Sequence, residues 1–197
     1  PAEAMAVMAA VAGGENRFNA IAARTGLTAA KLHGILQDLA ALELIRKEVR
    51  FGDRPGSRYS RYLCTDPLTG FWHRLVRPNS GALLGTPPER IWDERVAPRL
   101  DRWMGQVFEM IVGQALAGGA LLEPLGPVDE AASFWTRDGS TQIDWIARSG
   151  ERLAFVECKW RARGLVDLPA LKQLRDHVAR FPRRDLAEGA VLCLATS

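Results

Sequence analysis

The sequence predicts a chain of two modules, an α+β module at the N-terminus and an α/β module with a mixed sheet after it. Two patterns predict this order. Near the N-terminus, apolar residues recur at helical spacing and two short β-rich segments follow them. In the second half, a long amphipathic helix precedes two β-rich segments that meet at Ser149-Gly150, and a further helix and a buried strand come last. The expected modules are 1–65 and 99–197, joined by a helical connector over 66–98.

The composition is that of an ordinary globular protein, with 47% hydrophobic and 25% charged residues in 197 positions. No apolar run approaches the roughly 20 residues that cross a bilayer, and no secretory signal opens the chain. The three cysteines are scattered without C-x-x-C spacing, and the three histidines lie far apart. These features favour a cytoplasmic protein without a zinc site.

Positive charge is concentrated in one short segment. The net charge of the whole chain is +3, and residues 45–64 alone carry six Lys/Arg against two Asp/Glu. Residues 81–197 carry 15 Lys/Arg against 16 Asp/Glu. A nucleic-acid partner is therefore expected at the N-terminal module first.

Three helices are expected in the N-terminal module. Ala4–Ala12 is rich in small residues and stops at Gly13-Gly14, and Arg17–Arg24 forms a second helix. Thr28 caps a third, which runs to Glu43 with apolar residues at helical spacing. Two β segments follow, Ile45–Phe51 and Ser57–Cys64, with a Gly/Pro-containing turn between them.

The run FNAIAARTGLTAAKLHGILQDLAALELIRK resembles the helix-turn-helix of winged-helix proteins, and the two β segments resemble the wing. The resemblance implies that the third helix enters the major groove and that the basic wing contacts phosphates. The candidate DNA-binding residues are Lys31, Gln37, Arg46, Lys47, Arg50, Arg54, Arg58 and Arg61. The exposed face of the third helix is poor in arginine, so a winged helix that only docks a protein stays open as an alternative.

The connector is expected to contain two helices. The first starts at Asp66-Pro67 and has an aromatic face that includes Phe71 and Trp72; the second covers Glu89–Val96 and ends before Pro98. The aromatic face is expected to pack between the modules.

In the C-terminal module, Leu100–Leu116 is a long helix, and strands are expected at Ala120–Glu123 and Ser133–Thr136. Leu168–Phe181 is amphipathic, and Ala190–Thr196 reads as a buried strand. A strand, a helix and a parallel strand form a crossover unit, which is expected to be right-handed.

The hairpin Gln142–Trp160 organises this module. A two-residue turn at Ser149-Gly150 would place Asp144 opposite Phe155 and Gln142 opposite Glu157. Because side chains alternate along a strand, Asp144, Glu157 and Lys159 then share one face of a largely apolar hairpin. Buried carboxylates must be paired or bind a metal ion, and Mg²⁺ (or Mn²⁺) suits such a site.

Asp144 followed by Glu157-Cys158-Lys159 resembles the motif of the PD-(D/E)xK nuclease superfamily, with Ile143 in the place of the motif's proline. The resemblance implies a restriction-endonuclease-like αβββαβ core with a mixed sheet. It also implies metal ligands at Asp144 and Glu157, a catalytic Lys159, a further ligand at Glu109 on the first helix, and a helix glutamine near the site at Gln173.

Three runs, RYLCTDPLTGFWHRLV, IWDERVAPRLDRWMGQVFEMIVGQAL and QIDWIA with FVECKW, resemble the C-terminal region of archaeal-type P-loop AAA ATPases. The resemblance implies an ATPase module N-terminal to Pro1. Because this chain contains no G-x-x-x-x-G-K-[ST] motif, it is expected to be the C-terminal portion of a longer protein.

Three functions remain open at this point. The first is a Mg²⁺-dependent deoxyribonuclease with a DNA-binding winged helix, possible as an oligomer. The second is a catalytically inactive DNA- or protein-binding regulatory module of the ATPase, which the low positive charge of the second half favours. The third, a transcription factor, rests on the helix-turn-helix alone.

Five further arginines of the C-terminal module either hold the nucleic-acid backbone or are plain surface charge: Arg161, Arg163, Arg180, Arg183 and Arg184.

Overall fold

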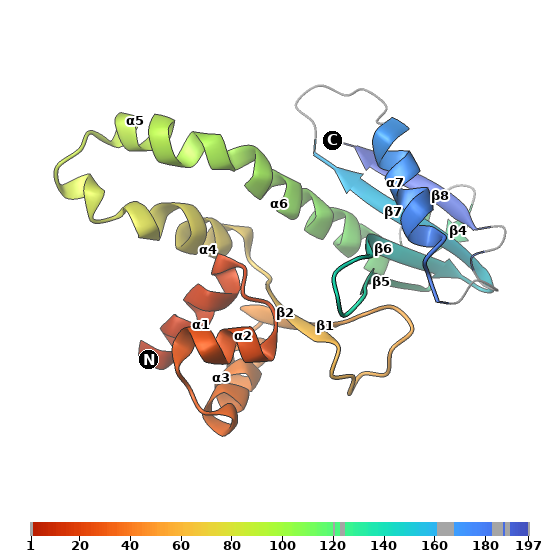
Figure 1. Cartoon of the computed structure of the whole chain (residues 1–197), viewed down its shortest axis with the longest axis horizontal. Coiled ribbons are helices and arrows are strands. Elements are labelled where there is room, and N and C mark those ends of the chain that lie inside the picture. The colour runs from red at the N-terminus through yellow and green to blue at the C-terminus, as the bar shows by residue number, and fades with distance from the viewer. Residues whose placement is uncertain are drawn as a thin grey trace. The chain divides into compact units, whose positions relative to one another are not determined.

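The structure, a computed structural model, describes residues 2–119, 121–122, 125–160, 168–182, 187 and 190–196 (Figure 1). Two compact units make up the chain. Unit 1 comprises Pro1–Glu48 and Ser60–Trp103, and unit 2 comprises Val49–Tyr59 and Met104–Ser197. The sequence-based boundaries fall elsewhere, because the connector joins the N-terminal unit and the outer part of the first hairpin joins the C-terminal one.

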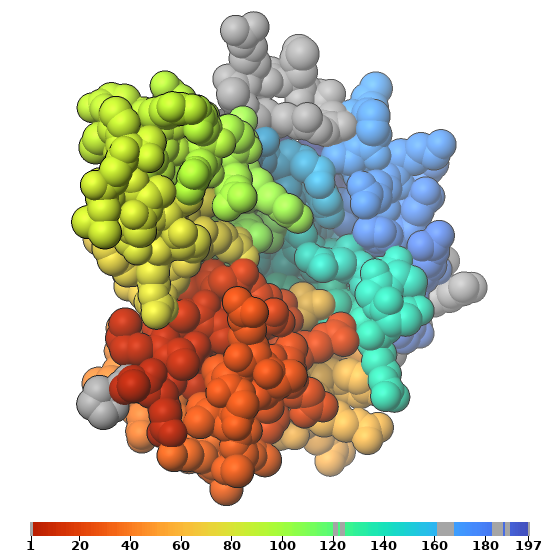
Figure 2. Space-filling view, turned by 60° about the vertical axis from the view of Figure 1, so that its left-hand side comes forward, coloured from red at the N-terminus to blue at the C-terminus, as the bar shows by residue number. Residues whose placement is uncertain are grey.

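Unit 1 begins with the three expected helices, α1 (Ala2–Gly13), α2 (Phe18–Thr25) and α3 (Ala29–Ala41). In the space-filling view they form one packed body in red and orange (Figure 2). Its core contains fully buried aliphatic side chains from all three helices: Val7, Ile21, Leu32 and Leu36.

The turn between α2 and α3 depends on a glycine. Gly26 has a φ of +70° and its N–H donates to the Ala22 carbonyl at 2.8 Å, which ends α2. A left-handed residue at this place favours glycine, because a Cβ would meet the following carbonyl. Thr28 precedes α3 as expected, although its side chain makes no capping hydrogen bond.

The two β segments form a hairpin of β1 (Ile45–Val49) and β2 (Ser60–Cys64). Ile45 and Tyr62 are buried against the three helices, and the Tyr62 N–H donates to the Asn16 carbonyl at 2.8 Å. Three helices followed by a packed hairpin is the expected helix-turn-helix with a wing. The strands are shorter than predicted, and the residues between them belong to unit 2.

The connector packs within unit 1. It consists of six short helices: α4 (Pro67–Phe71), η1 (Trp72–Val76), η2 (Arg77–Asn79), η3 (Ala82–Leu84), α5 (Pro88–Ile91) and η4 (Trp92–Val96). Asp66 caps α4 by accepting from the N–H groups of Leu68 and Thr69. Gly70 lies against the Trp103 ring, where any Cβ would come within 2.4 Å of that ring. Leu68 and Trp72 remain exposed, so the predicted aromatic face is only partly buried.

The second connector helix does not stop before Pro98. Helices α5 and η4 continue directly into α6 (Ala97–Ala117), and Pro98 is the second residue of α6. A proline inside a helix clashes with the carbonyl four residues earlier. Here that carbonyl belongs to the π-helical turn η4, which is wider than an α turn and gives the ring room.

Unit 2 is built on a four-stranded sheet of order β5 (Glu130–Trp135), β6 (Gln142–Ser149), β7 (Arg152–Lys159) and β8 (Val191–Thr196). The first three strands are antiparallel, and β8 is parallel to β7 after the helix α7 (Leu168–Val178). The predicted mixed sheet is therefore confirmed. A small separate ladder joins β3 (Leu121–Leu122) to β4 (Gly126–Pro127). Ala120 and Glu123, the ends of the first predicted strand, lie outside the described residues.

The two faces of the sheet have different helical covers. Leu153 and Phe155 of β7 pack with Leu174 of α7 and with Phe181 after it. The alternate residues Ala154 and Val156 pack with Leu116 of α6. Because β7 is apolar toward both faces, it is the central buried strand of the unit.

The predicted register of the β6–β7 hairpin is wrong by two residues. Ser149 pairs with Arg152, so the turn is Gly150-Glu151 and not Ser149-Gly150. Gly150 has a φ of +57°, while Glu151 does not have a positive φ. A two-residue turn with one positive φ places glycine first, and the Gly150 N–H is further fixed by the Asp129 carboxylate at 2.7 Å. A shift of two residues keeps every side chain on its predicted face.

Candidate functional site

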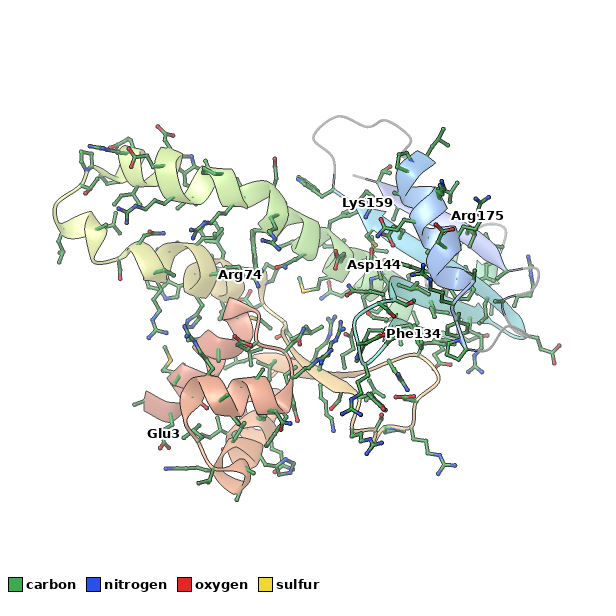
Figure 3. All side chains as sticks on the ribbon, viewed as in Figure 1. Glu3, Arg74, Phe134, Asp144, Lys159 and Arg175 are labelled. Atoms are coloured by element: carbon green, nitrogen blue, oxygen red, sulfur yellow. The ribbon has the colours of Figure 1, made fainter. Side chains whose placement is uncertain are left out.

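Asp144 on β6 and Lys159 on β7 lie at the same end of the sheet (Figure 3). Glu157 precedes Lys159 by two residues on β7. The observed pairing of Trp145 with Val156, continued by one residue, places Asp144 opposite Glu157. The corrected register therefore brings the two carboxylates closer than predicted, since Asp144 was expected opposite Phe155.

The ladder between β6 and β7 ends at this point. After Trp145 and Val156 no further pair is formed, and the Cys158 N–H donates to Asp144 Oδ2 at 2.8 Å. On its other side β6 is irregular, because Ala132 pairs with Ile146 but Phe134 pairs with Ile143. Two residues of β6, Asp144 and Trp145, thus face one residue of β5, Ser133. Such bulges turn a side chain away from its regular direction and are frequent beside active sites.

Glu157 and Lys159 form an ion pair along one strand. Lys159 Nζ lies 2.6 Å from Glu157 Oε1, and the Glu157 side chain is 7% exposed against 28% for Lys159. The two residues are two positions apart and so project from the same face. The lysine therefore compensates one of two neighbouring carboxylates, which leaves the other carboxylate near an excess of negative charge.

The excess of negative charge affects the pKa of Asp144. Burial and then the charge of Glu157 raise the pKa of Asp144 from its ordinary 3.8 to about 6. The Cys158 N–H, the charge of Lys159 and a hydrogen bond with Gln142 act in the opposite direction. Desolvation and a like charge disfavour the ionised carboxylate, and a bound cation would reverse both effects.

Asp144 and Glu157 suit a hard divalent ion. Carboxylate oxygens from few residues, with water completing the shell, are the usual protein ligands of Mg²⁺. Among the described residues, no group of three or more His, Cys, Asp and Glu side chains has the arrangement of a metal site.

Glu109 lies on α6, and its charge acts on Cys158 of β7, the strand that contains Glu157 and Lys159. Burial and the charges of Asp144, Glu109 and Glu157 raise the pKa of the Cys158 thiol. The Trp145 indole Nε1–H donates to the Glu109 carbonyl at 2.9 Å. Gly113, one turn along the helix, has no side chain, and a Cβ there would lie 1.9 Å from the Trp145 ring. This contact fixes the part of α6 that carries Glu109 against the sheet.

Gln173 is exposed on α7, one residue before the buried Leu174. The described contacts do not join it to the two carboxylates. Gln142, by contrast, contacts Asp144 through its side chain. Sequence reasoning placed Gln142 on the correct face but gave it no role, although its position two residues before Asp144 on one strand was a usable signal.

Two candidate DNA-binding residues lie on α3, and Lys31 and Gln37 are both exposed. Lys31 Nζ is 2.6 Å from Glu3 Oε1, and both side chains are about half exposed. A surface pair of this kind is weak and can exchange for a phosphate contact.

Three hairpin residues of unit 1 differ in availability. Lys47 is exposed, and Arg46 lies 3.7 Å from Glu48. Arg61 is partly buried on β2, and this burial lowers the pKa of its guanidinium while Glu48 raises it. Of the three, only Lys47 presents its charge fully to solvent.

The other three hairpin arginines belong to unit 2. Arg54 and Arg58 are exposed. Arg50 is directed inward: its Nε lies 2.8 Å from Asp53 Oδ2, and its guanidinium stacks over the Tyr59 ring at 4.2 Å. The arginines at 161, 163, 183 and 184 lie outside the described residues, and Arg180 is exposed.

A bilayer-spanning helix is absent from the part of the chain that the structure describes.

Two family profiles match the sequence. Residues 2–48 match the IclR helix-turn-helix domain, which confirms the predicted helix-turn-helix. Residues 72–172, half of the chain, match a family described as archaeal and bacterial proteins of unknown function, DUF234. This second match contains Glu109, Asp144, Glu157 and Lys159. No curated protein and no solved structure matches the chain significantly.

Proposed function

The chain belongs to the DUF234 family of archaeal and bacterial proteins, and we propose that it is a DNA-binding module with a metal-dependent nuclease site that hydrolyses phosphodiester bonds. The observation that carries the proposal is the pair of neighbouring carboxylates, Asp144 and Glu157, at the point where β6 and β7 separate. A buried like-charge pair costs stability, so its presence favours a functional reason over a structural one.

The residues divide the chemistry between them. Asp144 and Glu157 would hold Mg²⁺ or Mn²⁺, which when bound supplies a Lewis acid for the phosphoryl oxygen and lowers the pKa of a bound water. Lys159 Nζ lies 2.6 Å from Glu157 Oε1 and would place a positive charge beside a phosphate bound at the metal. Gln142 orients the Asp144 carboxylate through its hydrogen bond. Glu109 is proposed as an additional ligand, and Gln173 as a contact to substrate.

The order of elements supports this proposal. Unit 2 contains a helix, three antiparallel strands, a second helix and a parallel strand, namely α6, β5, β6, β7, α7 and β8. This order resembles that expected of a restriction-endonuclease-like core, with Asp144 on the second of the three antiparallel strands and Glu157 and Lys159 on the third. The helices cover opposite faces, which leaves the strand ends as the natural place for a site.

Unit 1 supports the DNA part of the proposal. It contains the helix-turn-helix domain, whose α3 presents Lys31 and Gln37 to solvent. We propose that α3 enters the major groove and that Lys47 contacts phosphate. The P-loop ATPase module expected from the sequence is proposed as a covalent partner that controls access to this DNA.

A second candidate function follows from the Glu157–Lys159 pair. An ion pair of 2.6 Å satisfies both side chains inside the protein, as a structural salt bridge would. In that case unit 2 is an inactive regulatory module that docks DNA or protein. The two candidates differ in one measurable property, the affinity of the Asp144–Glu157 pair for divalent metal.

The test is calorimetric titration of Mg²⁺ and Mn²⁺ into the intact chain, followed by incubation of the same samples with supercoiled plasmid. Asp144→Asn and Glu157→Gln remove one ligand charge each and keep the side-chain size. Asp176→Asn, on the exposed side of α7, removes one charge away from the site and is the matched control.

We expect binding and nicking in the wild type and in Asp176→Asn, and loss of both in the two site variants. Metal binding that survives in Asp144→Asn and Glu157→Gln would reject these residues as ligands. A wild type that binds no metal at millimolar concentration would establish the regulatory candidate instead.

A further inference from the structure

We infer that residues 49–59, called the hairpin loop below, form a nucleic-acid-binding loop of unit 2, in which Arg54 and Arg58 contact the phosphate backbone of the substrate. The inference rests on the proposed function for the identity of that substrate. It assigns the loop to the sheet that carries Asp144 and Glu157, and not to the helix-turn-helix whose hairpin it continues.

A glycine turn directs the start of the loop toward the sheet. The Asp53 N–H donates to the Arg50 carbonyl at 3.1 Å, which closes a turn over Phe51 and Gly52. Gly52 has a φ of +81°, as the third residue of a type II turn requires. Phe51, the residue before it, is 8% exposed and is part of the apolar core of unit 2.

The loop also covers the open edge of the sheet. The Phe51 N–H donates to the Ser133 carbonyl at 2.8 Å, and Arg50 Nη1 donates to the Trp135 carbonyl at 3.4 Å. Ser133 and Trp135 are two residues apart on the edge strand β5, so both carbonyls point to the same side. A strand edge with its carbonyls capped is protected from pairing with another chain.

Arg50 is an internal anchor of the loop. Its guanidinium lies 4.2 Å from the centre of the Tyr59 ring and 5.7 Å from that of Phe134, and it is held by Asp53. Asp53 also accepts from Ser57 Oγ at 2.8 Å, and the Tyr59 N–H donates to the same hydroxyl at 3.0 Å. These contacts connect the start of the loop to its end, and the Asp53 carboxylate neutralises the charge of Arg50.

The tip of the loop leaves two arginines in solvent. The Ser57 N–H donates to the Arg54 carbonyl at 2.8 Å across Pro55-Gly56, so Arg54 and Arg58 flank a tight turn. Both are exposed, and neither has an ion pair with any residue that the structure describes. The loop is thus fixed by its interior while its unneutralised charge faces outward.

Charge complementarity identifies the partner. Residues 104–197 carry 11 Lys/Arg against 12 Asp/Glu, a net charge of −1, which is a poor surface for a nucleic acid. The loop adds three arginines and one aspartate and brings the net charge of unit 2 to +1. Two guanidinium groups on a preorganised turn suit phosphates, which take bidentate hydrogen bonds and release counterions on binding.

The affinity test uses the full chain, a fluorescein-labelled DNA duplex of about 20 base pairs and its single strand, in EDTA over a range of KCl concentrations. The test variant is Arg54→Ala with Arg58→Ala. The matched control is Lys172→Ala with Arg175→Ala, which removes two exposed charges from α7 of the same unit.

We expect the loop variant to bind at least tenfold more weakly at about 0.1 M salt, with the slope of log Kd against log salt reduced by about two, one for each lost phosphate contact. Arg54→Lys with Arg58→Lys should restore most of the slope. An unchanged slope in the loop variant, or an equal loss in the α7 control, would overturn the inference.

The attachment of the loop is tested separately by amide hydrogen exchange. The Phe51 N–H should exchange as slowly as amides of β5, and Gly52→Ala should accelerate it while Gly56→Ala, where φ is not positive, should not. Exchange of Phe51 at the rate of a free loop would also overturn the inference.

These readouts separate the inference from the proposed function, because EDTA prevents any metal-dependent cleavage. Asp144→Asn and Glu157→Gln should bind DNA in EDTA at least as tightly as the wild type. Suppose that the wild type cleaves no DNA with Mg²⁺, and that the slope of log Kd against log salt is lower by two in the loop variant. This result would support the loop inference and reject the nuclease. Cleavage together with an unchanged slope gives the reverse conclusion.

Discussion

At the scale of single residues, three charged side chains of the candidate site affect the stability of the fold. Asp144 and Glu157 are neighbouring carboxylates with limited access to water, and Lys159 compensates one of them. An isolated structural salt bridge would need only two of the three. The third group, Asp144, therefore makes the metal-free protein less stable than a neutral residue would, a cost common at functional sites.

Asp144→Asn should stabilise the metal-free chain. The pKa of Asp144 is raised from 3.8 to about 6 in the folded chain, so the folded state binds this proton more tightly than the unfolded state does. The stability that the protonated carboxyl gives is present below about pH 3.8 and is lost as the pH rises through 6, whereas asparagine stays neutral. Two pKa units correspond to up to about 3 kcal/mol. Urea denaturation in EDTA should show this gain at pH 7.5 and little change at pH 4. A variant less stable than the wild type at pH 7.5 would contradict the electrostatic account.

Lys159→Met should have the opposite effect. It leaves the 7%-exposed Glu157 side chain beside Asp144 without its cation, and breaking a buried pair from one side costs about 3 kcal/mol. The loss should be large at pH 7.5 and smaller at pH 5, where Asp144, whose pKa is raised to about 6, is largely protonated and no longer repels Glu157. The same denaturation series measures it, with Lys172→Met on α7 as the control. An equal loss at both pH values would show that packing and not charge is responsible.

At the scale of elements, one close contact fixes α6 to the sheet. The Trp145 ring occupies the space above Gly113, and its indole N–H donates to the Glu109 carbonyl one turn earlier. The helix thus packs against the strand at a glycine, Gly113, and at a backbone carbonyl, that of Glu109. This contact decides where Glu109 lies, which no property of Glu109 itself reveals.

Gly113→Ala should be strongly destabilising, by about 3 kcal/mol or more, because the new Cβ would overlap the Trp145 ring and helix and strand must move apart. Combining it with Trp145→Leu should cost less than the sum of the two single changes, since the leucine vacates the space. A double-mutant cycle by chemical denaturation measures this coupling. Additive costs would mean that Trp145 and Gly113 do not share that space.

At the scale of the whole molecule, the two compact units have separate roles in the proposed function. Unit 1 contains the helix-turn-helix, and unit 2 contains the carboxylate pair and the hairpin loop. Ligand binding to one unit stabilises the elements that form its site and leaves the intrinsic stability of other elements unchanged.

Saturating Mg²⁺ should therefore protect unit 2 selectively. At a concentration about 100 times its Kd, a bound ion adds about 2.7 kcal/mol to any opening that breaks its site. Hydrogen-exchange mass spectrometry of the full chain should show slower exchange at β6 and β7 and no change at α3. The pattern should vanish in Glu157→Gln. Equal protection of both units would instead indicate a nonspecific salt effect.

The sequence by itself determined the three N-terminal helices and the shared face of the candidate site residues. Helical spacing located α1, α2 and α3, and Gly26 between them ends α2 because only glycine adopts its positive φ without strain. Alternation along β6 and β7 placed Asp144, Glu157 and Lys159 on one face. That conclusion survived an error of two residues in register, because side-chain faces repeat every two residues.

Only the tertiary structure decided which elements belong together. Phe51 and Arg50 read as part of a basic wing, yet they anchor to Phe134 and to carbonyls of β5, about 80 positions away in the sequence. The extension of α5 through Pro98 and the contact of Trp145 with Gly113 were equally hidden. Local propensity and periodicity describe a residue by its near neighbours in sequence, whereas these contacts depend on long-range packing, in which a glycine or a bare carbonyl matters as much as a side chain.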